Sequence, residues 1–270
     1  MDAEPWIRRY PQTVPPATAW RALFFPHSGG SADSCQPLAA RLAGFASTAG
    51  VRYPGRAERG REPFFTDVHV LADQVAGALA TVRADGPLLL FGHSLGAAVA
   101  YEVARRLPDQ RHTVLVASGH PAPSRLELPG FDDDGAGDAD ASLTELIRSL
   151  GGADAALLDH PLLRRMFLPV IRADLRAHRR YRPGPGSAVG CRVVALMGAD
   201  DPLTDEPRMQ AWQRHTTAPL RVHTFSGGHF FTHTHTAEVA ELLRHVMTAG
   251  PGTDPTHQGD THAARTPHTG

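Results

Sequence analysis

The stretch "LLLFGHSLGAAVAYEVARRL", residues 88–107, places one serine between two glycines, after an apolar run and before an alanine-rich segment. The apolar run predicts a buried strand and the alanine-rich segment a helix, so Ser94 lies at the turn between them. Gly92 and Gly96 remove side chains that would collide across a sharp bend. Strand, serine and helix in this order are typical of a nucleophile elbow, which presents a catalytic hydroxyl. The alternative is a glycine-rich turn that only packs a helix on a strand.

Apolar runs bounded by turn residues recur along the chain, and each predicts a buried strand. They are residues 21–26, 87–92, 112–119, 191–198 and 220–228. Amphipathic segments at 71–82 and 95–107 predict helices, the second ended by Pro108. Strands that alternate with helices predict an α/β fold, in which helices cover both faces of a mostly parallel sheet.

One helical segment interrupts this alternation. Residues 142–182 carry only helical patterns, so we expect a lid at about 125–185, beyond the carboxyl ends of the strands. The acidic, glycine-rich residues 128–142 predict a mobile loop ahead of it. The expected divisions of the chain are an N-terminal extension at 1–20, one domain containing the lid at 21–247 and a disordered tail at 248–270.

Composition argues against several partners. The 270 residues carry 27 arginines and lysines against 28 acids, so no net charge favours nucleic acid or an anionic membrane. No run reaches the about 18 apolar residues of a membrane helix, and the N-terminus has no signal-peptide pattern. Cys35 and Cys191, and the histidines at 229, 233 and 235, follow no familiar metal-ligand spacing. We therefore expect a monomeric cytoplasmic protein that holds no metal.

A serine hydroxyl attacks only when a base takes its proton, and a carboxylate must orient that base. After an elbow of this kind, the chain order is serine, acid, histidine. Asp200 and Asp201 follow one predicted strand and His229 ends the next, so all three lie on the sheet edge that carries the serine. The spacing from Gly198 favours Asp201 as the acid, and Asp200 remains the alternative. The other aspartate is expected to serve in the turn.

An acyl-transfer site also needs backbone N–H groups that bind the developing oxyanion. Leu95, at the start of the helix after the serine, supplies one. Ser28, in the loop "FFPHSGGS" after the first predicted strand, is expected to supply the other, with the His27 ring nearby. The alternative for this loop is an ordinary tight turn.

Further motifs accompany the serine motif: "LFFPHSGGSADSC", "VRYPGRAERGREPFF", "LIRSLGG", "LPVIRAD" and "FSGGHFF". Together they make the chain similar to type II thioesterases, the stand-alone editing hydrolases of polyketide synthases and nonribosomal peptide synthetases. The resemblance covers nearly all of residues 21–247 and implies an α/β-hydrolase fold with a helical lid. The site residues that it implies are Ser94 as nucleophile, His229 as general base, Asp201 as orienting acid, and the amides of Ser28 and Leu95 as oxyanion donors.

The resemblance also implies the substrate. It is an acyl thioester on the phosphopantetheine arm of an acyl or peptidyl carrier protein, and the enzyme needs no cofactor of its own. The chain departs from the family at Leu95, where methionine is usual, at Ser28, where alanine is usual, and at His120, where arginine is common. Because Leu95 and Ser28 act through backbone amides, we expect hydrolysis to tolerate these two changes.

Apolar residues of the lid follow helical spacing and are expected to line the acyl passage, or only to bury one another. They are Leu157, Leu158, Leu162, Leu163, Met166, Phe167 and Ile171. The residues expected at the substrate are Met166, Phe167, His27 and Phe230. Two groups of arginines are expected either to dock an acidic carrier protein or to form a solvated face. They are Arg52, Arg56, Arg59, Arg61, Arg172, Arg176, Arg179 and Arg180.

Other functions share parts of this pattern. A medium-chain fatty acyl carrier protein thioesterase has the same architecture. A serine acyltransferase would pass the acyl group from Ser94 to an alcohol or amine. A carrier-binding protein without catalysis would require an impaired site, and a lipase or esterase would share only the "GHSLG" motif.

Overall fold

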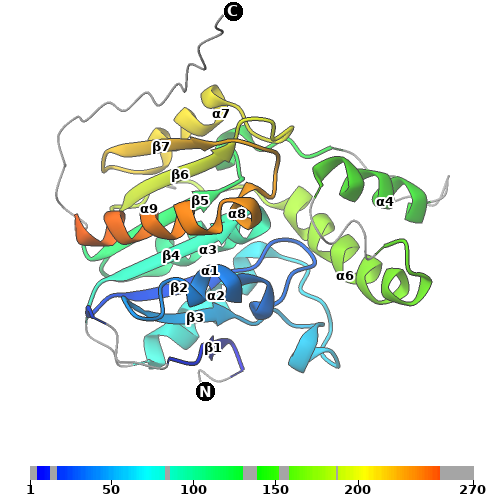
Figure 1. Cartoon of the computed structure of the whole chain (residues 1–270), viewed down its shortest axis with the longest axis horizontal. Helices are drawn as coiled ribbons and strands as arrows, with labels where there is room; N and C mark the ends of the chain where they lie inside the picture. Colours follow the sequence, from blue (N-terminus) through cyan, green and yellow to red (C-terminus); the bar gives the residue numbers. More distant parts are fainter. Residues whose placement is uncertain are drawn as a thin grey trace, which may run out of the picture.

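The computed structural model describes residues 5–12, 17–82, 86–129, 139–151, 158–186 and 188–249. Its seven strands form one sheet in the order β1-β3-β2-β4-β5-β6-β7 (Figure 1). They are β1 (Ile7–Arg9), β2 (Arg21–Phe25), β3 (Ser47–Val51), β4 (Leu88–His93), β5 (Thr113–Ser118), β6 (Arg192–Gly198) and β7 (Leu220–Phe225). Only β1 pairs antiparallel, with β3, so the predicted mostly parallel sheet is confirmed.

Most helices lie in the connections between these strands, and α8 and α9 follow the last strand. The α-helices are α1 (Gln36–Ala40), α2 (Val68–Thr81), α3 (Leu95–Arg106), α4 (Ala139–Leu150), α6 (Pro161–Arg180), α7 (Glu206–Gln210), α8 (Phe231–Thr234) and α9 (Thr236–Thr248). Short 3-10 helices span Ala32–Cys35, Ala57–Arg59, Pro123–Arg125 and Ala211–His215. The α2 helix begins earlier than residue 71 because the Asp67 carboxylate caps it, accepting from the backbone N–H groups of His69 and Val70.

Two strands were missed by the sequence analysis. The β3 sequence "STAGV" has no apolar run, and β1 is only 3 residues long, so neither carries a strand pattern. Because β1 pairs with β3, the segment at 1–20 expected as an extension contributes an edge strand to the sheet. The predicted strand at 220–228 ends at Phe225, before Gly227, whose φ of +95° turns the chain.

Both faces of the sheet are buried, which explains the continuous apolar runs of the central strands. Along β2, Leu23 and Phe25 point into one core, which α2 and α3 cover. Ala22 and Phe24 point into the other core, which α1 and α9 cover (Figure 1). Full burial of each large side chain stabilises the fold by roughly 1.5–3 kcal/mol.

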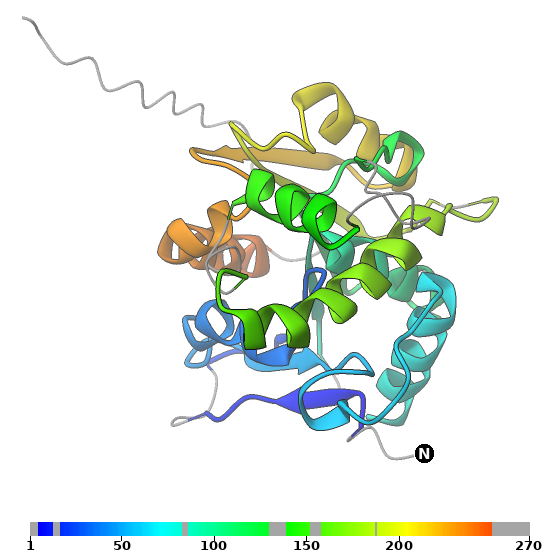
Figure 2. The same cartoon turned by 90° about the vertical axis from the view of Figure 1, so that its right-hand side faces the viewer.

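The predicted helical insertion lies between β5 and β6. The α4 and α6 helices stand beyond one end of the sheet in Figure 1, and Figure 2 views the structure from that side. They share a small core of their own, made of Leu143, Ile147, Leu158, Leu168 and Ile171. We call α4 and α6 the lid. Residues 130–138 of the predicted mobile loop and 250–270 of the predicted tail lie outside the described residues.

The start of α3 lies against the end of β2. A Cβ atom added at Gly96 would be 2.2 Å from the carbonyl oxygen of Phe25 and 2.7 Å from that of Pro26. We expect Gly96→Ala to lower the free energy of unfolding by at least about 2 kcal/mol, because neither backbone atom can move without shifting a strand or a helix. Urea unfolding measures this change.

Gly77→Ala in α2 is the matched control. Nothing lies within 4 Å of a Cβ atom at Gly77, so alanine there is expected to raise stability by up to about 1 kcal/mol through its helix propensity. Equal effects of the two substitutions would show that the contact at Gly96 does not constrain the fold.

Candidate active site

Ser94 lies at the turn between β4 and α3 in a strained conformation. Its φ of +54° and ψ of −125° are unfavourable for a residue with a side chain. A Cβ atom at Gly92 would lie 2.2 Å from the Gly96 carbonyl oxygen and 2.5 Å from the Ala97 nitrogen. The Ser94 N–H donates to the Ser118 carbonyl of the neighbouring strand at 2.8 Å, which fixes the turn to the sheet. Both glycines of "GHSLG" are therefore required by backbone contacts.

His229 pairs with Asp201, which follows the neighbouring strand β6. The His229 Nδ1 lies 2.9 Å from the Asp201 Oδ2, and both side chains are buried. Since a carboxylate only accepts, Nδ1 donates to it, and Nε2 is the ring nitrogen left for the serine proton. The other Asp201 oxygen accepts from the Leu203 N–H at 2.9 Å, and Asp200 is exposed. Of the two candidate acids, the structure therefore brings Asp201 to the histidine.

The loop after β7 carries His229 to the serine turn. Its ring centroid lies 5.0 Å from that of His93, the residue directly before Ser94. The Ser94 side chain does not cap the helix that follows it, which leaves its hydroxyl available for a hydrogen-bond link to His229. Such links are often long in the absence of substrate and tighten when it binds.

The loop after β2 can offer the Ser28 amide to a substrate. The Gly29 N–H donates to the Asp174 Oδ2 at 2.8 Å, and the Gly30 N–H donates to the His27 carbonyl at 3.0 Å. This leaves the Ser28 N–H without a partner among the described residues. Because Gly96 packs on the end of β2, this loop lies beside the Leu95 amide at the start of α3. The two predicted oxyanion donors are thus brought to the same turn.

Aromatic rings surround the histidine. Phe230 lies 5.1 Å from His229, 5.1 Å from His27 and 5.6 Å from His93, measured between ring centroids. Burial, with a smaller contribution from the nearby His229 and His27, holds the pKa of His93 well below its usual value. Two of the residues expected at the substrate, His27 and Phe230, therefore lie against the serine turn and its histidine.

A cavity of about 610 Å³ opens between α6 and the loops after β2 and β3. Its apolar wall is Leu158, Met166, Phe167, Val170 and Ile171, and its other side includes Gly29, Gly30 and Arg56. Of the predicted lid residues, Leu158 and Ile171 both line this cavity and pack in the lid core, whereas Leu162 is exposed and Leu157 lies outside the described residues. Leu158 and Ile171 thus combine a place in the cavity wall with a place in the lid core.

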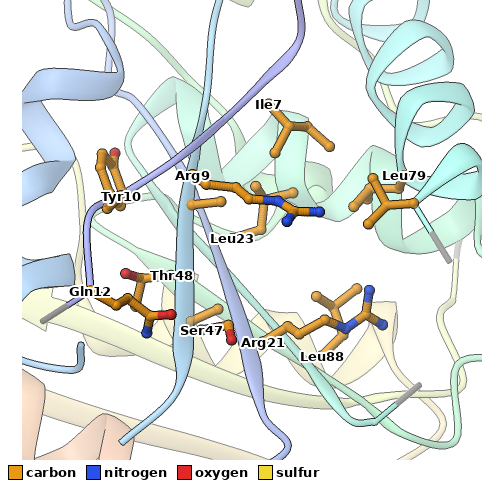
Figure 3. A pocket seen from close by; sticks show the side chains of 13 residues that line it. Ile7, Arg9, Tyr10, Gln12, Arg21, Leu23, Ser47, Thr48, Leu79 and Leu88 are labelled. Atoms are coloured by element: carbon orange, nitrogen blue, oxygen red, sulfur yellow. The ribbon is translucent and has the colours of Figure 1, made fainter. Parts of the chain in front are cut away.

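A second cavity lies at the opposite end of the sheet. It has a volume of about 310 Å³ and is lined by the first residues of β2, β3 and β4, namely Arg21, Ser47 and Leu88 (Figure 3). Since Ser94 follows the carboxyl end of β4, this cavity is separate from the serine turn.

Two histidines that the sequence did not pair join the lid to the sheet. The Nε2 atoms of His120, after β5, and His178, on α6, are 2.8 Å apart. His120 Nδ1 lies 2.5 Å from the Pro121 carbonyl oxygen and must donate to it, so its Nε2 accepts a hydrogen bond from the His178 Nε2–H. Burial lowers the pKa of His120 to about 4 and holds that of His178 well below its usual value. The contact therefore depends on two neutral rings.

The arginines expected to dock a carrier protein are partly used inside the protein. Arg56 is buried and paired with Asp174. Arg59 is buried, pairs with Glu62 at 2.5 Å and lies 3.9 Å above the Trp6 ring centroid. The prediction that Arg56 and Arg59 dock a carrier protein is therefore wrong, because both side chains are buried in ion pairs within the protein.

The sequence analysis missed Asp174 as well. A signal was present, because it is the lone acid in the arginine-rich helix "PLLRRMFLPVIRADLRAHRR". An isolated acid on an amphipathic helix otherwise rich in arginine indicates a specific partner.

No group of three or more histidine, cysteine, aspartate or glutamate side chains in the described ranges is arranged to hold a metal ion. Likewise, no helix in those ranges is long and apolar enough to span a membrane.

The fold and the site define a class of protein. A strained serine after a parallel strand, and a histidine paired with an aspartate after later strands, are the features of an α/β-hydrolase. The chain belongs to the Thioesterase domain family, which matches residues 21–247. It is thus a serine hydrolase of the thioesterase class.

Individual relatives agree. Thioesterase PikA5 of Streptomyces venezuelae is 37% identical over 256 residues, which is 92% of this chain and 87% of the relative. The probable cadicidin biosynthesis thioesterase of Streptomyces griseus is 39% identical over 254 residues, covering 91% of this chain and 68% of the relative. The solved structure of BorB, a type II thioesterase from the borrelidin biosynthetic cluster, is 36% identical with a TM-score of 0.78, covering 89% of this chain and 96% of BorB.

The His120–His178 contact predicts a pH-dependent stability. Both rings are neutral in the folded protein, and both take up a proton on unfolding below their ordinary pKa of about 6.5. Their contribution is therefore complete above that pH and is lost as the pH falls toward about 4, on the order of 3 kcal/mol for His120 alone. Urea unfolding between pH 7.5 and pH 4.5 measures the loss.

His178→Gln retains an N–H donor for His120 but removes one titrating ring, so we expect its stability to fall less steeply with acid. His112→Gln, at an exposed position, should leave the slope unchanged. Equal slopes in wild type and His178→Gln would contradict this account.

Proposed function

We propose that this protein is a type II thioesterase that removes acyl groups from the phosphopantetheine arm of acyl or peptidyl carrier proteins during polyketide or nonribosomal peptide biosynthesis. The observation that carries the proposal is the buried His229–Asp201 pair beside the strained Ser94 turn. The likeness to BorB and PikA5 supports the substrate class. Editing acts on aberrant or stalled acyl groups.

Ser94, His229 and Asp201 carry the chemistry in this proposal. The His229 Nε2 takes the Ser94 proton as Oγ attacks the thioester carbonyl, and Asp201 stabilises the imidazolium that forms. The imidazolium then returns the proton to the pantetheine sulfur, which leaves as a thiol. Water, activated by the same Nε2, attacks the acyl-serine ester and releases the carboxylic acid and free Ser94.

Two backbone donors hold the oxyanion. The amide of Leu95 lies at the positive end of α3, where partial charges favour an anion. The amide of Ser28, in the loop after β2, is the second proposed donor. Preorganised donors of this kind contribute to the rate because they need no rearrangement as charge develops on the oxygen.

The acyl chain is proposed to occupy the cavity beneath α6. Its wall is apolar and includes Met166 and Phe167, and the Met166 side chain is half exposed at the mouth. An apolar cavity without a charged group on its lid side suits varied short acyl chains more than one polar substrate. We propose that the enzyme needs no cofactor and acts as a monomer. We also propose that it acts in the cytoplasm, a reducing compartment in which the thiols of Cys35 and Cys191 stay free.

Substitution of the reacting groups tests the mechanism. We expect Ser94→Ala to lower kcat for acyl carrier protein hydrolysis by at least about 10⁴-fold, and Asp201→Asn by about 10³- to 10⁴-fold, because the three residues act together. Asp200→Asn is the matched control and should retain kcat within about 3-fold, since its side chain is exposed. Steady-state thiol release measures all three. Ordinary turnover by Ser94→Ala would rule out the acyl-serine route.

Carrier-bound substrates test the proposed role. Acetyl, propionyl and decanoyl carrier proteins, followed by intact-protein mass spectrometry, report which acyl group is lost. Editing predicts rapid loss of the short chains. Strong preference for the decanoyl chain would favour a fatty acyl thioesterase, and transfer to an added alcohol or amine in place of water would favour an acyltransferase.

A further inference from the structure

One buried carboxylate joins the lid to the loop after β2. Asp174, on α6, is fully buried and accepts the Gly29 N–H at 2.8 Å. The same carboxylate accepts two hydrogen bonds from the Arg56 guanidinium, at 2.5 and 2.6 Å. Arg56 also donates to the Gly30 carbonyl at 3.3 Å. Asp174 and Arg56 therefore hold consecutive residues of this loop.

Both polar groups of one peptide unit in this loop are hydrogen-bonded. In the unit between Ser28 and Gly29, the N–H is bound by Asp174 and the C=O lies 2.9 Å from the His27 Nδ1. A donor is required at that position, so the His27 ring carries its proton on Nδ1. With the following peptide plane fixed in this way, the direction of the Ser28 N–H depends on the backbone of Ser28 alone.

Packing against α6 supports the same loop. Gly29 has a φ of +81°, and a Cβ atom there would lie 2.5 Å from Cγ1 of Ile171. Ile171 and Asp174 are three residues apart and lie on one face of α6. This part of the lid therefore packs directly against the loop.

The Arg56 ion pair satisfies the buried Asp174 carboxylate. A buried carboxylate is stable only when it is paired and its lone pairs are satisfied. Arg56 supplies the charge, and its guanidinium is itself held 5.4 Å from the Tyr53 ring and 5.7 Å from the Phe65 ring. A charged acceptor binds a backbone N–H more strongly than a neutral acceptor does. The charge of Asp174 thus strengthens its hold on Gly29.

We propose that Asp174 is a positioning residue: through Gly29 and the Ser28–Gly29 peptide it aims the Ser28 amide at the thioester oxygen. The proposal rests on the proposed function, in which that amide binds the oxyanion. It makes α6 part of the machinery that stabilises charge in the transition state. A helix that only closed the acyl cavity would affect substrate binding instead.

Two variants test it. Asp174→Asn replaces one carboxylate acceptor by an amide, and the double variant Arg56→Met with Asp174→Leu removes both charges, so no unpaired charge stays buried if the single variant fails to fold. We expect kcat for a short acyl pantetheine thioester to fall about 10- to 100-fold in each, with KM changed less than about 2-fold, because a misdirected oxyanion donor weakens only the transition state. Asp159→Asn breaks the exposed lid ion pair with Arg148 and is the matched control.

A trifluoromethyl ketone supplies the readout that a merely structural role would not change. Ser94 Oγ adds to its carbonyl carbon, His229 takes the proton, and the ketone oxygen becomes an oxyanion held by the two amides. Its affinity should fall by the same factor as kcat in both Asp174 variants and stay constant in Asp159→Asn. Wild-type kcat and ketone affinity in a folded double variant would overturn the proposal, as would a rise in KM with kcat unchanged.

Failure of the proposed function gives a different result. If wild type releases no acyl group from any carrier protein, the substrate assignment is wrong. The ketone still reports the oxyanion site, because it needs only Ser94, His229 and the amides. A loss of ketone affinity in the Asp174 variants would then support the positioning role alone.

Discussion

Direct contact between backbones, at the point where β2 ends and α3 begins, determines the geometry of this protein. The Gly96 Cα lies so close to the carbonyls of Phe25 and Pro26 that no side chain fits between them. That approach allows Ser94 its strained conformation and sets the loop after β2 beside the first turn of α3. Parallel pairing of β4 with β5, of β5 with β6 and of β6 with β7 then brings the later loops to the same edge. The site follows from the sheet, with little freedom left to the loops.

The sequence predicted those parts that rest on local patterns. The "GHSLG" motif and the apolar strands of the sheet centre are short-range signals, and the structure contains both. The acid and the histidine were placed by their order along the chain, each after a predicted strand. The β3 strand could not be predicted, since "STAGV" is stabilised by its two neighbouring strands and not by its own apolar content. Its place in the sheet is a property of tertiary pairing.

The finer features of the site depend on burial, which a motif does not report. Spacing favoured Asp201 over Asp200, but only the fold buries Asp201 against His229 and leaves Asp200 exposed. Arginine side chains usually lie at the surface, so Arg56 and Arg59 were expected there. In the structure both are buried, Arg56 against Asp174 and Arg59 against Glu62. The partner of Arg56 lies 118 residues away in the chain, too far for any periodicity to reveal.

The Ile171 side chain contacts both the proposed acyl cavity and the loop after β2. It forms part of the apolar wall where the acyl chain is proposed to sit, and its Cγ1 presses on Gly29 beside the proposed oxyanion amide. Trimming this side chain to admit a bulkier acyl group would also loosen the loop that holds the amide. Acyl-chain preference and turnover would change together in such a protein, so redesign for new substrates is better directed at Met166, nearer the start of the same helix.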